Sequence, residues 1–89
     1  MKEEMVGVVR HYYSHLGVVG IILKGEMKVG DKIHIKGHTS DFTQKVDSME
    51  IGHHRVESAK GGEDIGIKVA EHAREHDEVY KIVEEKDAA

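Results

Sequence analysis

The segment spanning residues 25–37 restricts the fold more than any other part of this chain. Glycines stand at both of its ends, and a Gly-Asp pair in its middle is a typical turn sequence. After that turn, Ile33 and Ile35 share one face of the chain, while the residues beside them are charged or polar. Alternation with a period of two is typical of a strand buried on one face. The segment therefore predicts a short, half-buried strand over residues 32–36.

Six further segments have the composition or the alternation of strands. Val and Ile dominate the apolar residues, and β-branched side chains favour strands. The strongest turn signal, Gly61-Gly62, precedes a clean alternation that begins at Ile65. The seven strands that we expect lie at residues 5–12, 18–23, 32–36, 42–51, 54–58, 65–70 and 78–83.

The remaining segments are less regular. Residues 42–51 alternate imperfectly, with a change of phase near Ser48 that suits a bend or a bulge. Residues 71–78 lack an apolar stripe, so at most one helical turn is expected there, and residues 84–89 are expected to be a frayed, charged tail. The inward-facing candidates of the long strand are Phe42, Val46 and Met49.

Size and glycine placement favour a small all-β domain. Eighty-nine residues make one domain, expected over residues 1–89 with its core at about 5–83. Many short strands separated by glycine signals are typical of a small barrel or sandwich. Gly20 and Gly66 lie inside strand patterns, where glycine weakens a strand unless it permits a sharp bend or a close backbone approach. Because barrels need bends at their corners, we expect a closed barrel.

Composition excludes several kinds of function. The chain has no Cys, so it forms neither disulfides nor thiolate metal sites. Its formal net charge is −4, from 13 basic and 17 acidic residues, which offers no general attraction for a phosphate backbone. The longest apolar runs are far shorter than a membrane span of about 18 residues. A cytoplasmic location without membrane contact is therefore expected.

Several runs resemble a known family. Residues 18–23, Gly25 and residues 28–37 resemble the second domain of translation GTPases such as elongation factor Tu, and residues 46–50 and 59–69 are similar to its later strands. Similar barrels also occur at the ends of collagenase-like peptidases and as freestanding elongation-factor-like proteins, which this chain resembles most. The resemblance covers about residues 5–82. It implies a six- or seven-stranded Greek-key-like barrel that binds RNA, the ribosome or a translation-related protein.

The resemblance also suggests binding residues. In elongation factor Tu this domain holds the aminoacylated end of tRNA, and its site residues fall on Glu50, His53 and Asp64. His53 stands in place of an Arg, and Asp64 in place of an Asn. Aromatic and basic residues that could contact RNA by stacking and charge are Tyr12, Tyr13, Lys28 and Lys36. For the two tyrosines, covering one end of a barrel is the more ordinary role.

We expect a binding module rather than an enzyme. The chain has no phosphate-binding loop sequence, so it should neither bind a nucleotide nor hydrolyse GTP, and no cofactor is expected. A structural partner domain of a larger assembly is a second interpretation. The third is a small metal-dependent or acid–base enzyme, whose candidate carboxylates are Glu50, Glu57, Asp64, Glu75, Asp77 and Glu78.

Four histidines are the candidate metal ligands of that third interpretation, namely His53, His54, His72 and His76. Neighbouring residues on a strand point to opposite faces, which separates the first two. The second pair has i,i+4 spacing and would need a helical turn to face one ion. We therefore favour solvated surface histidines over a zinc site.

Overall fold

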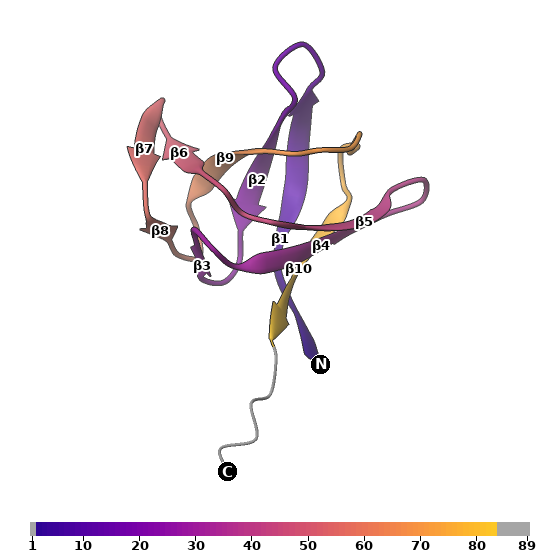
Figure 1. The fold of residues 1–89 in the computed structure, drawn as a ribbon, viewed down its shortest axis with the longest axis horizontal. Coiled ribbons are helices and arrows are strands. Elements are labelled where there is room, and N and C mark those ends of the chain that lie inside the picture. The colour runs from indigo at the N-terminus through magenta and orange to yellow at the C-terminus, as the bar shows by residue number, and fades with distance from the viewer. Residues whose placement is uncertain (1, 84–89) are drawn as a thin grey trace.

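The computed structural model describes residues 2–83, and every regular element in that range is a strand (Figure 1). The all-β prediction is confirmed. No helix in this part of the chain has the length and apolar character needed to cross a membrane. The expected tail at residues 84–89 lies outside the described residues. The strands are β1 (Lys2–Tyr13), β2 (Val18–Leu23), β3 (Met27–Lys28), β4 (Lys32–Lys36), β5 (Asp41–Lys45), β6 (Met49–Ile51), β7 (His54–Val56), β8 (Ser58–Ala59), β9 (Asp64–Lys68) and β10 (Glu78–Val83).

Three predicted strands coincide with β2, β4 and β10. The single strand predicted at residues 42–51 is wrong, because β5 and β6 are separate there and residues 46–48 connect them. That break accounts for the change of phase near Ser48. The strand predicted at residues 54–58 is divided into β7 and β8, and β8 pairs with β3, which was not predicted. Residues 71–77 contain turns and no helix.

Eight strands form one antiparallel sheet in the order β5-β4-β10-β1-β2-β9-β6-β7. The sheet ends at β5 and β7, which are not paired with each other, so the prediction of a closed barrel is wrong. Curvature is nevertheless strong, because β1 shifts register against both of its neighbours. Such bulges bend a strand and increase its twist. The sheet curls without completing the ladder that closure requires.

Buried side chains from alternate strand positions fill the interior of the curled sheet. The inward-facing prediction is confirmed for Phe42, Val46 and Met49, which are 6%, 1% and 0% exposed. Ile33 and Ile35 are also fully buried, as their alternation predicts. The other buried apolar residues are Val6, Val9, Val19, Ile21, Leu23, Met27, Ala59, Ile65, Ile67, Ala73 and Val79.

The side chain of Gln44 connects β5 to the chain at the end of β9. Its Nε2 donates a hydrogen bond to the Lys68 carbonyl oxygen at 2.8 Å, and its Oε1 accepts one from the Ala70 amide at 2.9 Å. The amide group thus links β5 to the end of β9, two segments that no backbone ladder joins. It also holds the backbone of Lys68 in place.

We expect Gln44→Ala to lower the free energy of unfolding by about 1–3 kcal/mol, since two hydrogen bonds are lost. Urea denaturation of the variant and the parent measures the difference. Thr43→Ala, at an exposed position of the same strand, is the matched control. A loss no greater than that of the control would show that the Gln44 link does not stabilise the curled sheet.

Candidate functional site

A row of residues crosses the outer face of β2, β9, β6 and β7. Gly20 pairs with Gly66, Gly66 with Glu50, and Glu50 with Arg55. Directly paired residues of a sheet point to the same face. The row faces outward, because the strand neighbours of its members are buried in the core, namely Val19, Ile21, Met49, Ile65 and Ile67.

Gly66 lies in this row at a position where the fold would also accept a residue with a side chain. A Cβ atom there would lie 3.5 Å from the nearest atom, Val18 Cγ1, which is an ordinary van der Waals distance. The pairing of β9 runs through Gly66 without a register shift on either side, so the predicted barrel corner is absent. Glycine inside a strand costs roughly 0.5–1 kcal/mol relative to alanine. At this position the absence of a side chain leaves the outer surface of the strand open.

Gly20 has a different effect from Gly66. Its own surface is buried, because Tyr13 and Arg10 lie against it, each with an atom 3.7 Å from where a Cβ would be. The missing side chain therefore lets the Tyr13 ring approach the sheet closely. Opposite this position, β1 shifts register between Val9 and His11.

These residues form a groove of about 620 Å³, which we call the Gly66 groove. One wall is apolar and includes Tyr13 and Leu16, which are 39% and 67% exposed. Its charged lining residues are Arg10, Glu50, Glu63 and Asp64. The only cation among them, Arg10, forms an ion pair within the groove, because its Nε lies 2.9 Å from Asp64 Oδ2. Hydrogen bonding to Tyr13, and then the negative charge of Asp64, raise the pKa of Arg10. The groove therefore combines an exposed apolar wall with an excess of carboxylates.

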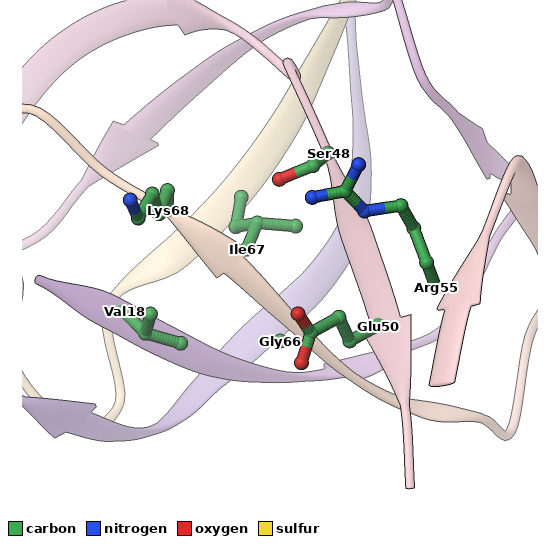
Figure 2. A pocket seen from close by; sticks show the side chains of 7 residues that line it. All are labelled: Val18, Ser48, Glu50, Arg55, Gly66, Ile67 and Lys68. Atoms are coloured by element: carbon green, nitrogen blue, oxygen red, sulfur yellow. The ribbon is translucent and has the colours of Figure 1, made fainter. Parts of the chain in front are cut away.

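A smaller hollow of about 230 Å³ adjoins the groove (Figure 2). It shares Val18, Glu50 and Gly66 with the groove. Its other lining residues are Ser48, Arg55, Ile67 and Lys68, and we call it the Arg55 hollow. The two depressions form one continuous surface across the outer face of β2, β9 and β6.

The structure brings together the three residues that the family resemblance singled out. Glu50, His53 and Asp64 all line the Gly66 groove. Their role in binding stays a prediction. Sequence reasoning named Tyr13, as a possible RNA contact, but missed Leu16 on the same wall and the part that Gly66 plays in the floor. The available signal was the glycine inside a strand pattern, which had indicated a barrel corner instead.

The four residues predicted to contact RNA do not converge. Tyr13 lines the Gly66 groove, whereas Tyr12 packs partly against the core and contacts the tilted ring of His72, with ring centroids 4.4 Å apart. Lys28 and Lys36 are exposed and line neither the groove nor the hollow. No single surface therefore collects all four.

The candidate metal ligands lie in two separate places. His53 and His54 lie at the turn between β6 and β7, and His53 has a φ of 67°. His72 and His76 line another hollow, beside His11 and Glu75. Between residues 2 and 83, no three His, Asp or Glu side chains are positioned to share a metal ion.

The candidate acid–base carboxylates are scattered as well. Asp77 is 4% exposed and serves the local turn, because its Oδ2 accepts a hydrogen bond from the Arg74 amide at 2.9 Å. Glu75 contacts His11 at 3.3 Å, and Glu78 accepts a hydrogen bond from the Tyr80 hydroxyl at 2.7 Å. Of the six candidates, Glu50 and Asp64 share the Gly66 groove.

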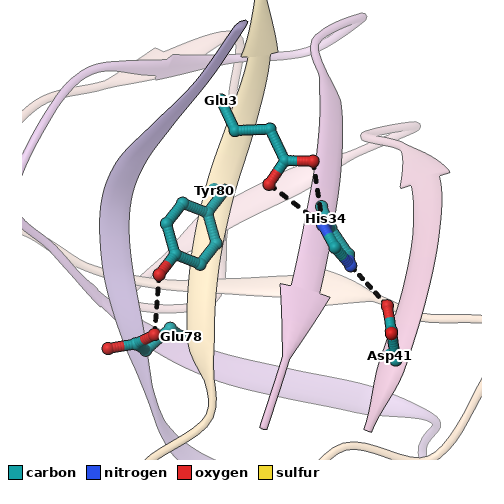
Figure 3. Close-up of polar contacts among 5 residues, drawn as sticks. All are labelled: Glu3, His34, Asp41, Glu78 and Tyr80. Atoms are coloured by element: carbon teal, nitrogen blue, oxygen red, sulfur yellow. Dashed lines mark hydrogen bonds and ion pairs between the residues drawn. The ribbon is translucent and has the colours of Figure 1, made fainter.

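His34 forms a second polar cluster on the surface of β1, β4, β10 and β5 (Figure 3). Its Nδ1 lies 3.0 Å from Glu3 Oε2, and its Nε2 contacts the Asp41 carboxylate. The hydrogen bond with Asp41, and then that with Glu3, raise the pKa of His34 even though partial burial opposes them. The hydrogen bond to Glu78 raises the pKa of Tyr80 beside it. Carboxylates on both ring nitrogens favour the doubly protonated imidazolium.

This cluster should make stability depend on pH. A pKa that is higher in the folded than in the unfolded state stabilises the fold fully below the unfolded value, about 6.5. The stabilisation is then lost as pH rises through the folded pKa. We expect the Tm to fall by a few degrees between about pH 6 and pH 9, and to fall less in His34→Gln. Identical pH profiles of the two proteins, measured by thermal melts, would contradict this role of His34.

Comparison with known proteins identifies relatives outside translation. No protein-family model matches the chain. A protein of Methanocaldococcus jannaschii named as an uncharacterized protease is 40% identical over 80 residues, which are 89% of this chain and 20% of that protein. A collagenase of Porphyromonas gingivalis is 36% identical over 83 residues, covering 91% of this chain and 23% of the relative. The chain thus spans about a fifth of the length of these curated relatives.

Solved structures show the same fold. The C-terminal domain of a Geobacillus thermoleovorans protein described as a U32 peptidase superposes with a TM-score of 0.84 at 18% identity, covering 90% of this chain and 93% of that one. Its selenomethionine variant gives a TM-score of 0.82 at the same identity, covering 85% and 96%. At this level of identity the likeness concerns the fold alone.

These findings overturn the translation-factor interpretation. The relatives are a protease and collagenases, and the structural neighbours are a peptidase domain rather than elongation factors. The prediction that the chain is a translation-factor-like binding module rather than an enzyme is therefore wrong. The physical reason is that glycine turns and strand alternation specify a small β fold, and a fold of this kind serves many functions.

Proposed function

We propose that this chain is a β domain of a protease and that it binds a polypeptide segment of the protein to be cleaved. Two findings support this role. The curated relatives are named as a protease and as collagenases. The similar solved structures are the C-terminal domain of a U32 peptidase, and they match this chain over nearly their whole length.

The observation that carries the proposal is the open strand surface at Gly66. A polypeptide in an extended conformation needs a floor without side chains if its backbone is to approach a sheet closely. It also needs apolar contacts that anchor one or two of its side chains. Tyr13 and Leu16 supply exposed apolar surface beside that floor. The excess of carboxylates in the groove favours segments that carry Lys or Arg near the anchored residue.

Denatured collagen is the first ligand to test, because two of the relatives are named collagenases. We expect fluorescence anisotropy to show saturable binding of labelled gelatin peptides, with a Kd on the order of 0.1 mM for a shallow groove. Amide chemical shifts should change at the residues that line the Gly66 groove, and filling the groove at Gly66 should remove the binding. Shift changes confined to the distant His34 cluster would contradict the proposal.

A further inference from the structure

The Arg55 hollow differs in charge from the groove that it adjoins. Two cations, Arg55 and Lys68, line it together with one carboxylate, Glu50, whereas the Gly66 groove has three carboxylates and one cation. The continuous surface therefore changes from acidic to basic along its length. A ligand that lies across both parts should carry a negative group at the basic end.

The cations of the hollow are available for a ligand. Among the ion pairs formed by residues 2–83, none includes Arg55, Lys68 or Glu50. Arg55 and Glu50 pair in register, yet Figure 2 shows the guanidinium beside Ser48 and apart from the Glu50 carboxylate. The Lys68 ammonium lies on the other side of Ile67. Two positive groups and a hydroxyl thus surround a small open space.

Part of this arrangement is held in place by the fold. The carbonyl oxygen of Lys68 accepts the hydrogen bond from Gln44, which fixes the backbone that carries the ammonium. Ile67 is 2% exposed and anchors the strand between the two cations. These supports fix the part of the strand backbone that carries Lys68.

Size and shape point to a carboxylate as the bound group. A hollow of about 230 Å³ holds a carboxylate and a short stretch of main chain but not a larger polyanion. The planar guanidinium of Arg55 matches a carboxylate with two parallel hydrogen bonds. The neighbouring carboxylates of the groove would repel the repeated phosphates of a nucleic acid.

We propose that the Arg55 hollow binds the C-terminal carboxylate of a polypeptide whose preceding residues occupy the Gly66 groove. This inference rests on the function proposed above. Gly66 lies in the floor of both depressions, so the main chain itself comes close to the sheet at this point. The negative group that a main chain carries without an intervening side chain is its terminal carboxylate.

Three matched peptides test the inference on the full chain. The first ends in a free carboxylate, the second is amidated, and the third is amidated with Glu as its last residue. We expect the amidated peptide to bind about tenfold more weakly, a difference of about 1.4 kcal/mol. Equal affinities of all three would overturn the proposal. If the amidated Glu peptide bound as tightly as the free-carboxylate peptide, an acidic side chain would be sufficient, and the proposal that the hollow binds the terminal carboxylate would be overturned.

Substitutions in the Arg55 hollow test whether the terminal carboxylate binds there. Arg55→Gln and Lys68→Gln should each weaken the free-carboxylate peptide several-fold and leave the amidated peptide unchanged. Both side chains are exposed, so the fold should tolerate these changes. Lys32→Gln, an exposed lysine on β4, is the matched control and should change neither affinity.

The two proposals fail in different ways. If Gly66→Val removes the binding of both peptides while Arg55→Gln changes neither affinity, the carboxylate proposal is overturned and the groove proposal survives. If no peptide binds to the unmodified chain, the proposed function itself is overturned.

Discussion

Gly66→Val is expected to abolish polypeptide binding while the fold remains intact. A Cβ atom at this position has ordinary van der Waals room, and the residue faces outward. Valine is also favoured in strands, so the free energy of unfolding should stay constant or rise by up to about 1 kcal/mol. The added methyl groups would occupy the floor on which the ligand backbone lies. We expect the Kd for gelatin peptides to increase at least about tenfold.

Two measurements on the same protein check this prediction. Urea denaturation gives the free energy of unfolding, and fluorescence anisotropy gives the Kd. Gly66→Ala adds a single methyl group and should have an intermediate effect on binding. If the valine variant binds gelatin peptides as tightly as the parent, the groove is not the binding surface. If it fails to fold, unimpaired binding by the alanine variant would lead to the same conclusion.

Gly7→Ala is expected to destabilise the fold by about 1–3 kcal/mol, because an added methyl group here has no space. The Cβ atom would lie 2.8 Å from the Ile22 carbonyl oxygen and 2.7 Å from Ile21 Cγ2. Neither atom can withdraw easily, since Ile21 is fully buried and both residues pair with β1. Gly7 also lies beside the shift in register between β1 and β10. The glycine is thus needed where the sheet bends.

Thermal and urea denaturation of Gly7→Ala and Gly66→Ala make a matched comparison. Both changes add one methyl group to a glycine inside a strand, and only the first adds it against the backbone of a neighbouring strand. A large loss is expected at Gly7, and no loss at Gly66. Equal effects on the free energy of unfolding would show that close backbone approach does not distinguish the two sites.

Local features of the sequence were sufficient to predict the positions of most strands. β2 and β4 follow directly from runs of aliphatic residues or from the alternation at Ile33 and Ile35. The period of a strand and the conformational preference of glycine are properties of a few neighbouring residues. The pairing of β3 with β8 could not be predicted, because each contributes only two residues and their contact depends on the rest of the fold.

The candidate site was predictable only in part. The resemblance to the translation-factor domain singled out Glu50, His53 and Asp64, and all three line one groove in the structure. The role of Gly66 was misjudged, because a sequence does not reveal whether a missing side chain serves a bend or leaves a surface open. That distinction depends on Val18 and Glu50, which are distant from Gly66 in sequence and lie beside it on the two neighbouring strands of the sheet.

The amino-acid sequence by itself determined the all-β class, most strand positions and the inward face of strands such as β4, because short-range alternation and glycine turns encode them. Only the tertiary structure decided that the sheet curls without closing, with Gln44 connecting its edge to the end of β9. It alone placed Tyr13, Gly66 and Arg55 on one continuous surface. The physical reason is that strand pairing brings together residues far apart in the chain, and register determines which of them share a face.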